Sequence, residues 1–238
     1  MTLRFPQVLG ALLKDRSGLA FMEFAYSLPL VLGIGLGGIE AANLAITRMR
    51  ISQIGMAVAD NAARAGQGSG MALAKMYESD VADVFDAARI QGTTINFKAR
   101  GKVILSSLQP NSVGGQWIAW QRCYGDKAFT SNYGTAGQGK TGTAFLGMGP
   151  TSALVTAPPQ NAVMFVEVAY DYKAIVEPFA RALQYFGMNV DNQVITYRGA
   201  FIVREPRELG DSTDVATTTA EDFGLFQNTP AVTRQVCT

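Results

Sequence analysis

The hydrophobic positions of this chain gather in one long run near the N-terminus. Residues 19–47 contain no Lys, Arg, Asp or His, and the only charged side chains among them are Glu23 and Glu40. A helix needs about 20 predominantly apolar residues to cross the hydrocarbon core of a bilayer, and residues 19–39 supply that length. The run therefore predicts one transmembrane helix, with Glu23 near one end of the span.

Beyond this run the pattern changes from apolar all round to apolar on one face. Five apolar residues recur there at helical spacing: Ile51, Ile54, Val58, Ala62 and Ala65. The opposite face is polar, and Asp60 and Arg64 are spaced as an i, i+4 ion pair. We expect the helix to continue to about residue 65, with its second part lying against a globular domain. A membrane helix followed by a stalk is the alternative.

Shorter helices and loops are indicated in the rest of the chain. Residues 80–89 predict a short helix that Ser79 caps and Gly92 ends. Its apolar face consists of Val81, Val84, Phe85 and Ala88. Pro178 can start another short helix. Residues 125–161, rich in Gly, Ser and Thr, predict a long loop, and the tail from residue 205 is expected to be irregular.

Alternating segments predict the strands of one sheet. They cover residues 95–99, 103–108, 116–124, 162–172 and 194–204. A turn at Arg100 and Gly101 is expected to join the first two as a hairpin. The third strand contains Trp117, Trp120 and Tyr124, which we interpret as core aromatics. This order of elements predicts an α+β domain with an antiparallel β-sheet, attached to a long N-terminal membrane helix.

Composition narrows the possible classes of function. The net charge of +1 over 238 residues gives no electrostatic reason to expect nucleic acid as a partner. The chain has no histidine, which excludes Ser-His-Asp and Cys-His sites and every His-ligated metal site. We therefore expect neither an enzyme nor a cofactor. Cys123 and Cys237 suggest one disulfide if the domain is exported, and two buried thiols if it is cytosolic.

Three groups of residues resemble chemical sites, and each has a simpler interpretation. Residues 137–142 contain Gly-Lys-Thr but lack the first glycine of a phosphate-binding loop, so we interpret them as a flexible loop. Glu167 and Asp171 share one face of a predicted strand, and a solvent-facing polar surface explains them without catalysis. Four tail carboxylates could hold calcium, although a solvated acidic tail is expected on composition: Asp211, Asp214, Glu221 and Asp222.

A more specific motif lies at the start of the apolar run. Gly18 follows a basic cluster, the acid–aromatic pair Glu23 and Phe24 comes five residues later, and Pro29 lies further into the helix. A carboxylate within a membrane helix is costly and is a functional candidate by default. This arrangement resembles the processing site of type IV pilin-like precursors. It is most similar to the TadE-like pseudopilins of tight-adherence pilus systems.

The resemblance implies a processing step and a set of partners. A prepilin peptidase would cut between Gly18 and Leu19, which leaves Glu23 as the fifth residue of the mature chain. The mature helix would wait in the inner membrane and then assemble with other pilins or pseudopilins. Residues 114–125 and 156–159 also resemble TadE-like proteins of this size.

The same resemblance divides the chain into three parts. Residues 1–18 would be a cytoplasmic leader, residues 19–65 a transmembrane and then amphipathic helix, and residues 66–238 a periplasmic α+β domain. Basic residues before Gly18 agree with a cytoplasmic leader. Glu40, a second acid in the apolar run, departs from the family pattern.

Three features of the run have their own interpretations. Gly33 and Gly37 form a G-x-x-x-G pair that favours close helix packing, although glycine is also simply frequent in membrane helices. Pro29 removes one helical hydrogen bond and can kink the helix. A conventional signal peptide would have a shorter apolar region. The nearest candidate for its cleavage site, at residues 41–43, matches the small-residue pattern only weakly.

The alternatives to a pilus assembly subunit come from other classes. A membrane-anchored ligand-binding or adhesive module would use the 125–161 loop as its contact surface. A membrane-tethered hydrolase would need Glu167 and Asp171 as its carboxylates, and no nucleophile motif accompanies them. A minor pseudopilin of a secretion system is a close variant of the main interpretation.

Overall fold

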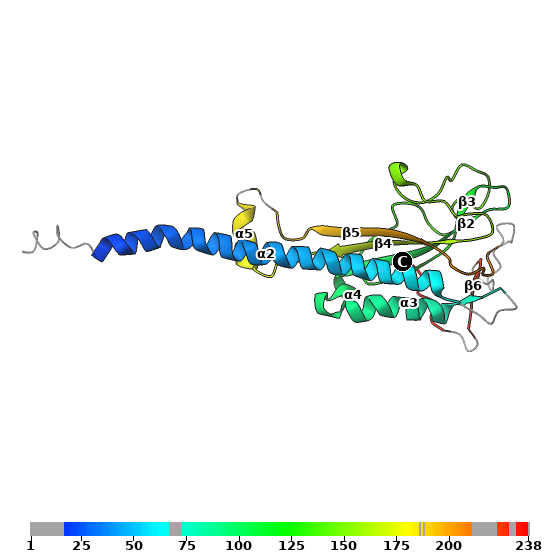
Figure 1. Cartoon of the computed structure of the whole chain (residues 1–238), viewed down its shortest axis with the longest axis horizontal. Coiled ribbons are helices and arrows are strands. Elements are labelled where there is room, and N and C mark those ends of the chain that lie inside the picture. Colours follow the sequence, from blue (N-terminus) through cyan, green and yellow to red (C-terminus); the bar gives the residue numbers. More distant parts are fainter. Residues whose placement is uncertain are drawn as a thin grey trace, which may run out of the picture. The chain divides into compact units, whose positions relative to one another are not determined.

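The computed structural model of the protein describes residues 17–66, 73–185, 187, 189–210, 223–228 and 232–237 (Figure 1). A long apolar helix is followed by a domain with a four-stranded antiparallel sheet and short helices, which confirms the predicted α+β class. The elements follow the order α2 (Ser17–Arg64), β1 (Met76–Tyr77), α3 (Glu78–Gln91), η1 (Thr93–Ile95), α4 (Phe97–Arg100), β2 (Gly101–Pro110), β3 (Gln116–Tyr124), η2 (Thr151–Ala153), β4 (Val163–Asp171), α5 (Glu177–Gln184), β5 (Val194–Ile202) and β6 (Leu225–Phe226).

The chain divides into two compact units, and α2 contributes to both. The smaller unit contains the described residues up to Ala45 together with Ala174–Asp191, the segment between β4 and β5. The larger unit contains Ile46–Lys173 and the described residues from Asn192 onward.

The main sheet lies in the larger unit and has the strand order β3-β2-β4-β5. Every neighbouring pair is antiparallel, and Val168 of β4 lies between Val103 of β2 and Tyr197 of β5. Asn111 closes the tight β2–β3 connection, because its side-chain oxygen accepts hydrogen bonds from the N–H groups of Val113 and Gly115.

The second half of α2 packs on one face of this sheet. The helix comes so close at Gly55 that a Cβ there would lie 2.2 Å from the Tyr197 ring and 3.1 Å from Val168. Four of the five side chains predicted for this face, Ile51, Ile54, Val58 and Ala62, are buried, and Ala65 just past the end of the helix is half-buried. The expected amphipathic half of the helix is therefore confirmed, and it lies against a domain rather than forming a free stalk.

The long 125–161 segment covers the sheet as a further layer. Residues from β2, β3, β4 and this segment share one hydrophobic cluster: Leu108, Ile118, Met148, Ala157, Val163 and Phe165. The 137–142 segment lies in the loop as predicted, but it is fastened rather than loose. The N–H of Gly137 donates to the Ile118 carbonyl at 2.7 Å, and the N–H of Ile118 donates to Gln138 at 2.9 Å.

Helix α2 ends where its last carbonyls find a side-chain donor. The Arg207 guanidinium donates to the carbonyls of Ala62 and Ala63 at 3.1 and 3.2 Å, which occupies acceptors that a helix end leaves open. Burial lowers the pKa of Arg207 to about 10, which leaves the group cationic at neutral pH. Gly66 then turns the chain with a left-handed φ of 75°, which glycine adopts without steric cost.

The predicted strand at residues 95–99 is wrong. The chain forms η1 and α4 there, separated by Asn96 in the left-handed conformation with φ 51°. Phe97 is the only buried residue of these two elements, and its ring stacks with Tyr124 and Tyr170 at 6.5 and 6.2 Å. One buried aromatic can be anchored without an extended backbone. The expected hairpin between residues 95–99 and 103–108 therefore does not form, and β2 pairs with β3 and β4.

The start of α3 also differs from the prediction. The helix begins at Glu78 with Tyr77 as its N-cap, and not after Ser79. The Asp80 carboxylate accepts from the Tyr77 N–H at 2.8 Å, while the Ser79 N–H donates to Asn228 in the tail at 2.9 Å. The predicted buried face and the end at Gly92 are confirmed.

The described part of the tail contains a short strand that was not predicted. Its strand β6 pairs in parallel with β1, with Met76 opposite Leu225. Both of these residues are buried, and so is Phe226.

Candidate functional site

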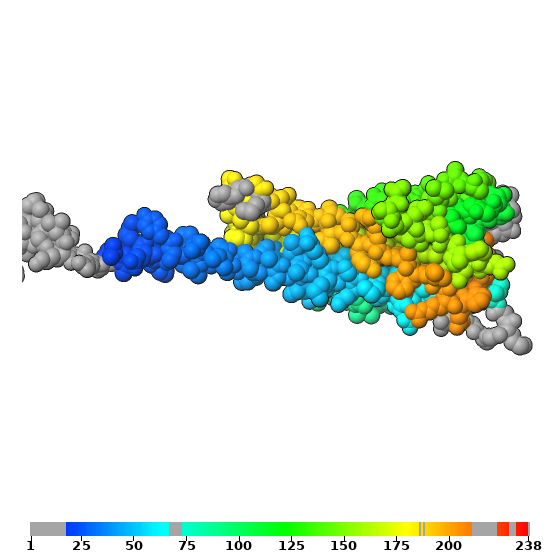
Figure 2. Space-filling model, turned by 45° about the horizontal axis from the view of Figure 1, so that its top comes forward, coloured from blue at the N-terminus to red at the C-terminus, as the bar shows by residue number. Residues whose placement is uncertain are grey.

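The candidate processing site lies near the start of the described part of α2. The peptide bond between Gly18 and Leu19 lies within this helix, which is described from Ser17 onward. The described side chains from residue 18 to residue 32 are all exposed, with Leu19 at 63% and Phe24 at 58%. Figure 2 shows this part of the helix in blue, uncovered on the face in view.

The exposed part of α2 is apolar enough to cross a bilayer. Its most apolar window has a mean hydropathy of 1.7 and no buried residue. Pro29 lies inside the helix, which continues on both sides of it. By its length and composition this part of α2 could therefore serve as a membrane anchor.

Glu23 is the one charged side chain in this exposed stretch. Within the described residues no ion pair or hydrogen bond engages its carboxylate. Glu23 lies four residues after Leu19 on a continuous helix, so the two residues share a face about one turn, or roughly 6 Å, apart. A new α-amine at Leu19 would therefore fall within reach of the acid.

Glu40 has a structural role that the sequence interpretation missed. Its side chain is only 4% exposed, and its carboxylate accepts hydrogen bonds from the backbone N–H groups of Ile175 and Val176, both at 3.1 Å. All three residues belong to the smaller unit. The departure from the pilin-like pattern is thus a docking point for residues 174–176. The sequence signal was a second acid without a nearby base, but its partners come about 135 residues later.

The G-x-x-x-G pair is used unequally within the described residues. A Cβ on Gly37 would lie 3.4 Å from the Phe179 ring of α5, whereas a Cβ on Gly33 would meet nothing within 4 Å. Gly37 thus packs against this chain's own α5. Ala174 closes the base of the segment, because its N–H donates to the Asp191 carboxylate at 2.9 Å.

The predicted disulfide is present between Cys123 and Cys237, which are 114 residues apart. The Cys123 N–H also donates to the Gln235 carbonyl at 2.8 Å, so the end of the tail is fastened to β3 twice. Closing so long a loop restricts the unfolded chain strongly.

Glu167 is not the solvent-facing residue that the strand pattern predicted. It is 1% exposed, because the 125–161 loop covers this part of β4, and its carboxylate accepts from the Ser131 hydroxyl and from the Asn132 N–H at 3.0 Å. Burial raises the pKa of Glu167, and the Ser131 hydrogen bond opposes that shift in part. Asp171 instead pairs with Lys127. Glu167 and Asp171 thus have different partners, and the two carboxylates do not form a catalytic pair.

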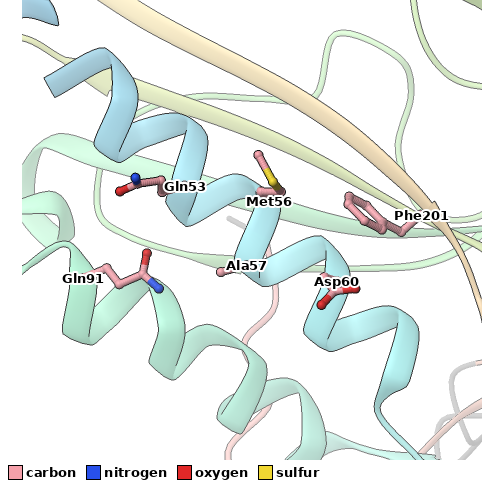
Figure 3. Close-up of a pocket in the computed structure, with 6 residues that line it drawn as sticks. All are labelled: Gln53, Met56, Ala57, Asp60, Gln91 and Phe201. Atoms are coloured by element: carbon pink, nitrogen blue, oxygen red, sulfur yellow. The ribbon is translucent and has the colours of Figure 1, made fainter. Parts of the chain in front are cut away.

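A shallow hollow of about 470 Å³ lies beside the second half of α2 (Figure 3). Its lining comes from α2, α3 and β5: Gln53, Met56, Ala57, Asp60, Gln91 and Phe201. Asp60 is its only charged residue, and Arg64 and Arg204 both pair with that carboxylate. The hollow therefore offers no free nucleophile, acid or base.

Metal ligation has little support in the described part of the chain. No group of three or more His, Cys, Asp or Glu side chains comes together there. The four tail carboxylates considered for calcium, Asp211, Asp214, Glu221 and Asp222, lie outside the described residues.

Comparison of the chain with protein-family models, with curated proteins and with solved structures finds no match. The resemblance to TadE-like pseudopilins therefore rests on the motif around Gly18 and Glu23 and on the segments that accompany it.

Proposed function

We propose that this chain is a membrane-anchored, pilin-like assembly subunit, similar to the TadE-like pseudopilins of tight-adherence pili. A prepilin peptidase removes residues 1–18, the helix from Leu19 onward anchors the protein in the inner membrane, and the α+β domain faces the periplasm. The mature chain then assembles with other pilins or pseudopilins, and it carries out no catalysis.

The observation that carries the proposal is the two-part character of α2. One continuous 48-residue helix has an exposed apolar first part and a second part that is buried against the sheet. An exposed apolar helix needs lipid or neighbouring apolar helices, because water disfavours so much apolar surface. A subunit that moves from a bilayer into a helical bundle meets that need in both states.

The disulfide supports an exported domain. Disulfides persist in oxidising compartments such as the periplasm and are rare in the cytosol. The Cys123–Cys237 bond lies in the larger unit, so this part of the chain suits the periplasmic side.

Glu23 is proposed to direct assembly. An acid at the centre of a membrane helix costs about 2.5–3.5 kcal/mol on insertion scales, and less near the interface. A cationic partner offsets that cost, and the α-amine of Leu19, in the same chain or in a neighbouring subunit, is one turn away. Pairing between subunits would then favour one register of adjacent helices.

Glu23→Gln tests this proposal, with Glu40→Gln as a matched control on the same helix. We expect Glu23→Gln to leave cleavage after Gly18 intact and to lower co-purification with the other pilin-like chains of the same envelope by roughly tenfold or more. Glu40→Gln should keep cleavage and co-purification even though it loosens the segment after Ala174, because the Glu40 carboxylate is bonded within this chain and is not offered to a neighbouring subunit. Leader cleavage is read from a gel shift and assembly from pull-down of the tagged chain. Unchanged co-purification of Glu23→Gln would remove the assembly role.

A further inference from the structure

Residues 174–185 contain the short amphipathic helix α5, which packs against the end of the apolar stretch of α2. Figures 1 and 2 both show α5, in yellow, beside this helix. Two contacts within the smaller unit fix it there: the Phe179 ring lies against Gly37, and the Glu40 carboxylate holds the N–H groups of Ile175 and Val176. The segment is therefore fastened at one height along α2.

For a membrane span that starts at Leu19, this position along α2 falls at the boundary of the bilayer. Residues 19–39 form about 31 Å of helix at 1.5 Å per residue, close to the roughly 30 Å of a hydrocarbon core. Gly37 and Glu40 lie at the last turn of this stretch and just beyond it. A segment that touches both of them lies where acyl chains give way to headgroups.

The residues that flank α5, Ile175 before the helix and Tyr185 as its C-cap, expose apolar and aromatic side chains. Ala180 is buried, whereas Tyr185 is 92% exposed and Ile175 is 61% exposed. Arg181 lies one turn before Tyr185, pairs with Glu177 at 3.4 Å and keeps 76% of its side chain exposed. Tyrosine is enriched at membrane–water interfaces, and an arginine on such a helix favours anionic phospholipid headgroups.

We propose that residues 174–185 are a second membrane contact, which rests in the periplasmic headgroup layer of the bilayer that α2 spans. Tyr185 and Ile175 reach the boundary of the acyl chains, and Arg181 lies beside lipid phosphates. The segment holds α2 at a fixed depth and must leave the lipid when the helix is withdrawn for assembly. This inference rests on the proposed membrane anchor.

Depth-dependent fluorescence quenching of the full-length, disulfide-bonded chain tests the inference. Single cysteines at Tyr185→Cys, Ile34→Cys and Leu146→Cys receive an environment-sensitive fluorophore, since the two native cysteines are bonded to each other. The labelled chains are placed in vesicles of phosphatidylethanolamine and phosphatidylglycerol, with nitroxides at the headgroup or deep in the acyl chain. Ile34 is 70% exposed in the proposed span, and Leu146 is 67% exposed in the 125–161 loop.

We expect the label at position 185 to be quenched mainly by the headgroup nitroxide, severalfold more than the label at position 146. The label at position 34 should respond mainly to the deep nitroxide. Adding Glu40→Gln should release the segment and reduce quenching at position 185, while position 34 stays unchanged.

The possible failures of the two proposals are distinct. Quenching at position 34 but none at position 185 above the level at position 146 would overturn the interfacial contact alone. Absence of quenching at position 34 would overturn the membrane anchor and the inference together. A label at position 185 that is shielded from lipid would mean that a second copy covers α5 if the unlabelled Tyr185→Cys chain also forms an intermolecular disulfide on mild oxidation, and this too would contradict the proposal.

Discussion

The two halves of α2 belong to one helix but are built for different surroundings. Ile34 in the first half is 70% exposed, whereas Ile54 in the second half is fully buried. In the second half apolar residues keep to one face, and the sheet covers that face. In the first half they occur on every face. The helix therefore shows that residue type alone does not determine where a side chain belongs, while the periodicity of the pattern does.

The two acids of the apolar run show the same contrast. Glu40 is buried and bonded to two N–H groups within its unit, whereas Glu23 is exposed and engages no other described residue. A carboxylate bonded within its own chain serves the fold. One that remains open in an apolar stretch is available to a neighbouring subunit, and this is why we propose an assembly role for Glu23.

The largest expected effect concerns the unit that holds the second half of α2. Replacing both cysteines, with Cys123→Ser and Cys237→Ser, frees a loop of more than 100 residues and should cost up to about 4–5 kcal/mol in the chain-entropy description. Urea unfolding followed by the fluorescence of the buried Trp117 and Trp120 measures the loss. Reduction of the parent chain is the control, and the reduced parent should unfold at the same urea midpoint as the double variant. An unchanged midpoint would mean that the bond does not stabilise the domain.

A matched pair of substitutions addresses the helix halves directly. Ile54→Ala should lower the free energy of unfolding of the domain by about 2–5 kcal/mol, because it leaves a cavity in a packed core. Ile34→Ala removes the same atoms from an exposed position and should change the free energy of unfolding by less than about 0.5 kcal/mol. The same urea titration in detergent measures both. Equal losses for the two variants would contradict the distinction between the halves.

The smallest expected effect is a change in pH dependence at Glu167. Because burial raises the pKa of this acid, its contribution to stability is full below about pH 4.5 and falls as the pH rises through the raised value. Glu167→Gln removes that loss, so the variant should gain relative to the parent as the pH rises, and the difference should then become constant.

Unfolding midpoints between about pH 4 and pH 8 measure this difference. Asp171→Asn, on the same strand but half exposed, controls for the removal of a charge. A parent–variant difference that stays constant with pH would show that ionisation of Glu167 does not affect folding.

Local patterns predicted much of the fold. The third strand matches β3 at both ends, and α2 ends within one residue of the expected position. In both cases a long run of residues with one periodicity sets the boundary. The pattern at residues 95–99 had only three apolar positions, and packing of Phe97 decided the backbone there instead.

The missed features all depend on distant residues. Strands β1 and β6 have two residues each and pair across about 150 residues, so neither shows a pattern of its own. The partners of Glu40 lie in the β4–β5 connection. Glu167 was assigned to solvent because its cover is a loop with no periodicity. Candidate site residues can be recognised from motifs, but their partners become apparent only in three dimensions.

The start of the mature chain tests the central claim most directly. We propose that α2 is a processed anchor, so N-terminal sequencing of the protein extracted from its native membrane should begin at Leu19. The exposed part of α2 around Gly18 is compatible with such a cut. An intact N-terminus at Met1, or a start near Asn43 as a conventional signal peptidase would leave, would contradict the pilin-like account.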